Sequence, residues 1–409
     1  MTRAVRRPFT PSEALFTLSE GRASFDRLRA RPSRRARWLA LVALVALVAA
    51  AAPAAAEPWR ASLEVGGEVD TNVRRISVTP GGRQAETAPL VRAVAELARR
   101  GKAGEHTRWA LRLAGGARAV VAGAVVGEDL LIGSIDVAAE RDGPGDDVAL
   151  LARVTHYDVV PVGGENGARA FASSGADLGL RLVGGEGRAA TLTAGVRRLD
   201  YKPDPDFDWL GQAATVRVTD ELWREADERW LELAVAYRIE RRGYRGRAFT
   251  DGCAPGEPRT PACFVPTGEP RTDLQHVSGA ELTYTGGAVL SATYQLVFND
   301  SASFGSSYVR HRVILSATRA LGRAWFATAT VTGQLDHFRD PLLVTDDLNM
   351  TFTSIDDENR SGAAVRVARA VGEAWELEAR YAFQADASGG DDLTYRRHLV
   401  YAGLTWERD

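Results

Sequence analysis

The chain has 409 residues, of which 45% are hydrophobic, 25% charged and 8% aromatic, with a formal net charge of -2 and a mean hydropathy of -0.19. That much apolar side chain excludes a disordered chain. A membrane protein built from several helices is also excluded, because it needs several apolar runs of about 20 residues, and the chain has a single apolar run, near its N-terminus.

The first 56 residues have the layout of a secretory signal. Three arginines between positions 34 and 37 precede an apolar run from Trp38 to Ala52, and Ala54-Ala55-Ala56 follows Pro53. A basic region, a short apolar run and a small-residue site are typical of a signal peptide. We therefore predict an N-terminal extension plus signal peptide over 1–56, cleaved after Ala56, and one domain over 57–409. The run is too short to favour the alternative, a transmembrane anchor.

Removal of this segment changes the charge. It carries 10 arginines against 3 acids, which leaves 41 of 51 basic and 50 of 53 acidic residues, a net charge of about -9. Nucleic-acid binders carry a basic patch and usually a basic balance, so this class is excluded.

Apolar residues recur at every second position beyond residue 57. One example runs from Leu231 to Ile239, where leucine, valine, tyrosine and isoleucine alternate with polar or small residues. This period is the signature of a strand with one apolar face. It predicts about 16 strands (14–18): 59–69, 89–100, 106–118, 130–140, 147–157, 168–183, 188–201, 208–219, 229–242, 273–285, 287–299, 306–319, 323–337, 360–369, 373–384 and 394–407.

The connections between these segments alternate in length. Short ones at 101–105, 141–146, 184–187, 286, 320–322 and 370–372 alternate with long ones at 70–88, 119–129, 158–167, 202–207, 243–272, 300–305, 338–359 and 385–393. The turn at 220–228 is longer than the other short ones and leaves room for a helical turn. An even strand number with short periplasmic turns and long external loops is typical of outer-membrane barrels.

The predicted fold is therefore all-β, a single antiparallel transmembrane β-barrel in the bacterial outer membrane. Lipid cannot hydrogen-bond a backbone, so the sheet must close, and aromatic residues should gather at both interfaces. Tryptophans at 59, 109, 230, 325 and 375 adjoin predicted short turns, whereas Tyr157, Tyr201, Tyr308 and Phe338 lie near the long-loop ends. These two groups predict two aromatic girdles. A secreted β-sandwich or propeller is the alternative, but it would not need the asymmetry in loop length.

Two short motifs carry a resemblance. Tyr401, Gly403 and Trp406 resemble the assembly signal on the last strand of outer-membrane barrels, which implies recognition by the barrel-assembly machinery. Gly67-Glu68-Val69-Asp70-Thr71-Asn72-Val73 is similar to the opening of barrels for surface-lipoprotein assembly and polysaccharide export, without their tetratricopeptide repeats. Over 59–409 the chain resembles outer-membrane barrels of the porin size class.

Strand alternation predicts a lumen lined with charge of both signs. The basic residues are Arg108, Arg112, Arg153, Arg181, Arg217, Arg238, Arg310, Arg312, Arg366 and Arg380. The acidic ones are Glu64, Glu96, Asp136, Glu232, Glu376 and Glu378. Such side chains either tune the selectivity of an aqueous pore or brace the wall as salt bridges, and both interpretations stay open.

The remaining chemistry-bearing residues point to no catalytic or metal site. Cys253 and Cys263 lie close together in a Pro/Gly-rich segment, and an exported pair predicts a disulfide that closes one loop. The six histidines are scattered, so we expect no enzyme and no cofactor. The loops near 340–358 and 391–392 are rich in aspartate, and solvated charge is a better interpretation than a cation site.

The sequence favours a passive, porin-like channel for small polar solutes. The alternatives are a conduit or accessory barrel for export or surface assembly of polysaccharide or lipoprotein, and a structural barrel with a sealed lumen. The loops at 243–272 and 338–359 are the candidates to fold inward and narrow a pore. Expected partners are outer-membrane lipid and lipopolysaccharide, the transported solute or polymer, and possible further copies of the chain.

Overall fold

The computed structural model describes residues 59–73, 85–121, 125, 128–143, 147–162, 170–185, 187–225, 228–254, 257, 261–340, 361–386 and 395–408. The predicted signal peptide over 1–56 lies outside these residues, as do loop residues 341–360 and 387–394 with their aspartates. No helix among the described residues is long and apolar enough to cross a membrane.

Sixteen strands form one closed antiparallel barrel in which each strand pairs with its neighbours in sequence. They are β1 (Arg60–Asp70), β2 (Ala88–Lys102), β3 (Thr107–Val120), β4 (Leu130–Asp142), β5 (Val148–Pro161), β6 (Phe171–Val183), β7 (Arg188–Tyr201), β8 (Trp209–Glu225), β9 (Arg229–Asp251), β10 (Phe264–Thr285), β11 (Val289–Ser301), β12 (Tyr308–Ala320), β13 (Trp325–Phe338), β14 (Ser361–Val371), β15 (Trp375–Asp386) and β16 (Tyr395–Arg408).

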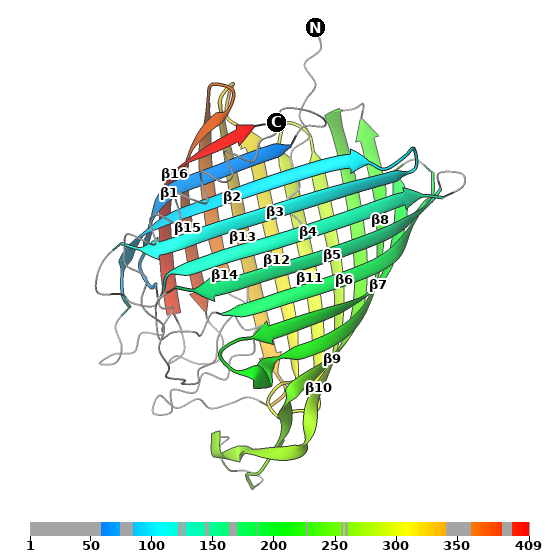
Figure 1. Ribbon diagram of the computed structural model, residues 1–409, viewed down its shortest axis with the longest axis vertical. Coiled ribbons are helices and arrows are strands. Elements are labelled where there is room, and N and C mark those ends of the chain that lie inside the picture. The colour runs from blue at the N-terminus through cyan, green and yellow to red at the C-terminus, as the bar shows by residue number, and fades with distance from the viewer. Residues whose placement is uncertain are drawn as a thin grey trace.

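The barrel closes where β1 pairs with β16, with Ala61 opposite Arg408, so the first strand begins where the last one ends (Figure 1). The tight turns lie at that same end, including Gly372 with a φ of 72° in the β14–β15 turn. The long connections lie at the opposite end. The predicted strand number, order and loop asymmetry are therefore confirmed.

The outward positions of the strands carry the apolar side chains. Leu150, Leu192 and Leu335 are 56%, 55% and 56% exposed, an arrangement that only lipid or a partner would cover. At the turn end this face carries tryptophan, and the guanidinium of Arg99 lies 5.2 Å from the ring of Trp59 and 5.8 Å from that of Trp109. The tryptophan girdle is present as predicted, except that strand alternation places Trp230 on the inward face.

The four residues predicted to form the aromatic girdle at the long-loop end do not face the lipid. Tyr157, Tyr201, Tyr308 and Phe338 occupy inward positions, where Tyr201 is 2% and Tyr308 4% exposed. Alternation within each strand decides the face, and these four residues share the parity of the lumen arginines. The outward face instead carries three tyrosine–histidine pairs, each hydrogen-bonded between adjacent strands. They are Tyr237–His276, Tyr294–His311 and Tyr381–His398.

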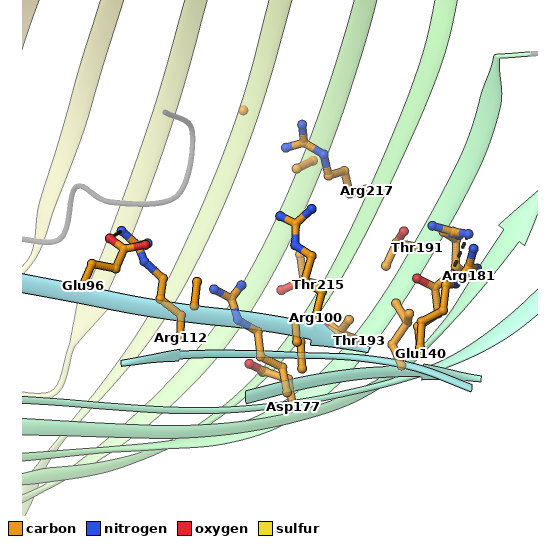
Figure 2. Close-up of a pocket in the computed structure, with 18 of the residues that line it drawn as sticks. Glu96, Arg100, Arg112, Glu140, Asp177, Arg181, Thr191, Thr193, Thr215 and Arg217 are labelled. Atoms are coloured by element: carbon orange, nitrogen blue, oxygen red, sulfur yellow. Dashed lines mark hydrogen bonds and ion pairs between the residues drawn. The ribbon is translucent and has the colours of Figure 1, made fainter. Parts of the chain in front are cut away.

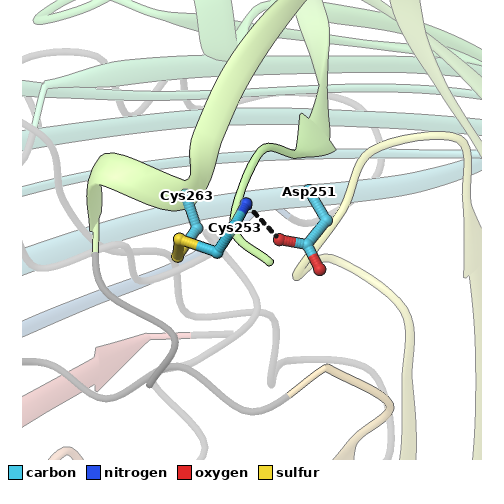
Figure 3. Close-up of side chains that lie close together, drawn as sticks. All are labelled: Asp251, Cys253 and Cys263. Carbon is cyan, nitrogen blue, oxygen red and sulfur yellow. Dashed lines mark hydrogen bonds between the residues drawn. A yellow bond between two sulfur atoms is a disulfide. The ribbon is translucent and has the colours of Figure 1, made fainter. Parts of the chain in front are cut away.

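The predicted loop at 243–272 is mostly strand. β9 and β10 continue beyond the other strands as a hairpin that projects from the barrel (Figure 1). A disulfide between Cys253 and Cys263 joins its two arms as predicted, and the Asp251 carboxylate accepts a hydrogen bond from the Cys253 backbone amide at 3.1 Å (Figure 3). The hairpin does not fold into the lumen. In the turn at 220–228, residues up to Glu225 continue β8 past a register shift near Glu221, and Glu228 just before β9 has 3-10 helical geometry.

The Asp-Thr-Asn-Val motif holds the β1–β16 seam together. Asp70 is fully buried and binds Arg397 of β16 and Arg118 of β3. The Thr71 hydroxyl accepts the His398 backbone N–H at 2.9 Å, and the Thr71 N–H donates to the His398 carbonyl at 3.0 Å. Val73 is buried with Leu90 and Val125 in an apolar cluster. The motif therefore extends strand pairing past the end of β1 and has a structural role here.

Tyr401 of the predicted assembly signal faces inward at the same seam. Gly403 lies opposite Gly66 in the β1–β16 register. A Cβ on Gly66 would come within 2.5 Å of the Tyr401 ring, and a Cβ on Gly403 within 2.1 Å of its hydroxyl. The two glycines thus make room for the ring, which covers backbone that lacks side chains. Trp406 lies on the outward face, opposite Trp375.

Candidate functional site

The barrel encloses a cavity of about 2830 Å³. It opens at the turn end, where Lys102, Gly286 and Arg408 line it, and reaches inward to Arg242, Gln275 and Arg310. Sixteen strands enclose a space wider than their side chains fill, which accounts for the volume. This lumen is the candidate functional site.

All sixteen predicted lumen residues occupy inward positions of their strands. Eleven of them line the cavity: Arg108, Arg112, Arg153, Arg181, Arg217, Arg238, Arg310, Arg312, Arg366, Glu96 and Glu376. The other five are Arg380, Glu64, Asp136, Glu232 and Glu378. Arg380 binds Glu64 at 2.8 Å and Asp136 binds Arg153 at 2.6 Å, so these groups support the wall. Glu232 lies in register between Glu221 and Thr283.

Seven lining cations were missed by sequence reasoning, namely Arg60, Arg100, Lys102, Arg197, Arg242, Arg319 and Arg408. Arg197 and Arg242 each adjoin a second arginine, so composition alone did not show which one faces inward. The position of each arginine along its strand, odd or even, does predict which face it occupies. Arg242 shares the parity of Arg238 on β9, and Arg197 shares that of Thr193 on β7.

Positive charge faces the free space of the lumen. Among the described lining residues, fifteen arginines and one lysine stand against five carboxylates, Glu96, Glu140, Asp177, Glu376 and Glu407. Figure 2 shows guanidinium groups of Arg100, Arg112 and Arg217 reaching into the bore from different strands. Many of the compensating carboxylates are recessed, and Glu240 and Glu378 are only 0% and 5% exposed. Arginine is the longer side chain, so its head group reaches water while its partner stays near the wall.

The ion pairs run along the wall. Arg112 binds Glu96 on the neighbouring strand at 2.7 Å, and Arg181 binds Glu140 two strands away at 2.6 Å. Arg217 on β8 binds Glu281 on β10 at 3.2 Å. These pairs brace strands that are one or two positions apart, and so they leave the centre of the bore open. Both the bracing and the lining interpretations apply to the same arginines.

The inward side chains pack together toward the long-loop end. Leu130, Val159, Phe171, Leu199 and Tyr201 form a buried apolar cluster on β4 to β7, covered by Trp209. On the other side of the barrel Asp273, Gln275 and Asn299 are buried and hydrogen-bonded. The lumen is therefore wide at the turn end and narrower at the opposite end.

No histidine lines the described cavity. Strand alternation places His156, His276, His311, His337 and His398 on the outward face instead. Asp251 and the two cysteines lie close together, but the sulfur atoms are joined as a disulfide and offer no thiolate to a metal ion. The described residues thus form no acid–base or nucleophilic arrangement in the lumen.

No protein-family model matches the chain, and no curated protein matches it. Among solved structures it is similar to OccAB1 of Acinetobacter baumannii, with 10% identity, 86% of this chain and 97% of that chain covered, and a TM-score of 0.45. It is also similar to Salmonella typhi OmpF in complex with daunomycin, with 11% identity, 86% of this chain and 98% of that chain covered, and a TM-score of 0.43. A bacterial polysaccharide outer membrane secretin is similar at 10% identity, with 85% of this chain and 98% of that chain covered and a TM-score of 0.40.

The fold itself rests on the strand pairing, the closed sheet and the apolar exterior. A closed sheet satisfies every backbone group without water, and the apolar residues face outward while the charged ones face a cavity. The chain is a transmembrane β-barrel of the bacterial outer-membrane type.

Proposed function

We propose that this barrel is a passive channel for small polar solutes across the outer membrane. The observation that carries the proposal is the open cavity of about 2830 Å³ with a lining of guanidinium, carboxylate and threonine groups. Water and hydrated solutes are stable beside such groups, and wall-bound ion pairs keep the centre free. The proposal assigns no catalytic step to the chain.

The sealed structural barrel is less well supported. Ion pairs that filled the bore would have to join opposite walls, whereas Arg112–Glu96, Arg181–Glu140 and Arg217–Glu281 join near neighbours. The apolar cluster around Tyr201 does narrow the long-loop end. Passage of a solute therefore depends on the polar side of that end, between β9 and β13.

Export of an acidic polymer is a second candidate because the lumen exposes mainly positive charge. The Asp-Thr-Asn-Val motif is shared with barrels of this kind, and in this chain Asp70 and Thr71 of the motif pair with β16 at the seam. A swelling assay in proteoliposomes separates the two candidates. A passive channel admits small sugars and sugar acids in the order of their size, whereas an export conduit closed at rest admits neither.

A further inference from the structure

Arg312 is a lumen cation that forms no ion pair with any carboxylate among the described residues. It lies on β12 and lines the cavity, and its Nε is buried without a hydrogen-bond partner. No described residue forms a hydrogen bond or an ion pair with its guanidinium. A buried N–H donor without an acceptor lowers the stability of the fold. A water molecule or an anionic ligand can supply the missing acceptor.

The inward-facing carboxylate of the neighbouring strand β13, Asp336, is already in use. Asp336 accepts from Arg310 at 2.8 and 3.1 Å and from the Gln334 side-chain amide at 3.0 and 2.9 Å. In the strand register Arg312 lies between Gln295 and Gln334, two neutral amides. By contrast, Arg217, Arg238 and Arg310 each bind a carboxylate.

The wall between Arg217 and Arg312 has small residues at Ala236 and Gly279. One register row runs Arg217–Ala236–Gly279–Gln295–Arg312 across β8 to β12. A Cβ on Gly279 would meet nothing closer than a carbonyl oxygen at 3.5 Å, so the space above it is free. Strands lie about 4.8 Å apart, which puts roughly 19 Å of wall between the two arginines. The row thus forms a shallow hollow with a cation at each end.

The neighbouring register row, two residues along each strand, also has an arginine at each end. It runs Arg238–Val277–Val297–Arg310, and all four residues line the cavity. The hollow is therefore flanked by four guanidinium groups, three of which are already paired. A guanidinium presents two parallel N–H donors that match a carboxylate or phosphate. Of the four, Arg312 alone forms no hydrogen bond or ion pair with another of the residues that the structure describes, and its buried Nε lacks a partner.

We propose that this hollow, with Arg217, Gly279, Gln295 and Arg312, is a binding site for small organic oxyanions that pass through the lumen. The proposal rests on the passive-channel function and names its preferred solute class. Arg312 binds the anionic oxygens, Gln295 hydrogen-bonds a neighbouring polar group, and Gly279 leaves room for the body of the solute. Neutral solutes pass without this contact.

Calorimetric titration of the detergent-folded protein with gluconate and with inorganic phosphate tests the site without any need for conduction. Arg312→Gln is expected to weaken binding about tenfold, the effect of one lost charge-assisted contact. Arg319→Gln on the same strand removes the same charge at the turn-end mouth and is the matched control. Equal affinities for the wild type and Arg312→Gln, or no binding by the wild type, would overturn the proposal.

Bilayer recordings then test the function separately. In a salt gradient the wild type is expected to prefer anions, and gluconate to reduce the chloride current. Arg312→Gln should weaken both effects while it still conducts, because the other lining arginines remain. Binding without conduction would leave the site standing and reject the channel, whereas conduction with no effect of Arg312→Gln on selectivity or block would reject the site.

Discussion

Asp70 and Arg397 bind each other across the seam between the first and last strands, although 327 positions separate them in the chain. The guanidinium Nε donates to both carboxylate oxygens at 3.0 and 3.1 Å, and Nη2 donates to Oδ2 at 2.5 Å. Arg118 is a second arginine bound to the Asp70 carboxylate, at 2.7 Å. The pair is buried inside the barrel, so it acts where closure of the sheet is completed.

Asp70→Asn should lower the stability of the closed barrel. Removing one partner of a buried ion pair costs roughly 3–5 kcal/mol, because the remaining charge is left without compensation. The measurement is the temperature at which the folded band disappears in heat-modified gel electrophoresis. Asp200→Asn is the control, because its pair with Arg198 is exposed and such pairs contribute only about 0–1 kcal/mol. Equal melting of both variants would contradict a role for Asp70 in closure.

Adjacent glycines on β1 provide a second test of the seam. A Cβ on Gly66 would lie 2.4 Å from the Ala402 carbonyl oxygen and 2.5 Å from the Tyr401 ring, whereas a Cβ on Gly67 meets nothing within 4 Å. Gly66→Ala should therefore reduce the yield of folded barrel in lipid vesicles, and Gly67→Ala should fold like the wild type. If Gly66→Ala folds normally, close packing of Tyr401 on the seam is wrong.

The alternation of apolar and polar residues was enough to predict the strands. The predicted 188–201 matches β7 at both ends, and most other boundaries differ by a few residues. In the structure the same alternation puts the predicted lumen arginines at inward positions of their strands, although other arginines such as Arg99 lie on the outward face at the turn end. The girdle prediction for Tyr157, Tyr201 and Tyr308 used their position near the strand ends in place of alternation, and it was wrong because tyrosine is stable both at a lipid interface and in a packed interior. Chemistry alone does not choose its face.

Two other features depended on contacts between distant segments. The β9–β10 hairpin continues past the bilayer region, where water removes the need for an apolar face, so its sequence reads as loop. The isolation of Arg312 arises from the pairing of Asp336 with Arg310 and Gln334, which a one-dimensional pattern does not record. The Asp-Thr-Asn-Val motif was noticed in the sequence, but its role appeared only with the register of β1 and β16.

The disulfide should matter to the hairpin and leave the barrel unaffected. Cys253 and Cys263 join the arms of β9 and β10 beyond the other strands (Figure 3). Reduction is expected to leave the melting temperature of the barrel and its conductance unchanged, because neither the seam nor the lumen contacts this bond. Limited proteolysis with trypsin should instead cut faster at exposed arginines such as Arg245 and Arg247. A large drop in melting temperature on reduction would show that the hairpin supports the barrel itself.

The apolar cluster should limit passage at the long-loop end. Tyr201 is buried against Phe171 and Leu199, and Tyr201→Ala would leave a cavity inside the barrel at a cost of roughly 3–5 kcal/mol. The expected result is a less stable barrel with a larger single-channel conductance. Leu192→Ala, on the outward face, is the control and should leave conductance as it is. Unchanged conductance in Tyr201→Ala would place the narrowest point elsewhere.

The central claim is that the barrel interior is a continuous aqueous path. Single-channel recording of purified protein in planar bilayers, with folding verified beforehand by heat-modified gel mobility, tests it most directly. We predict stepwise insertion of channels with a stable open conductance that rises in proportion to salt concentration. Folded, inserted protein that never conducts would contradict the account and identify the barrel as sealed.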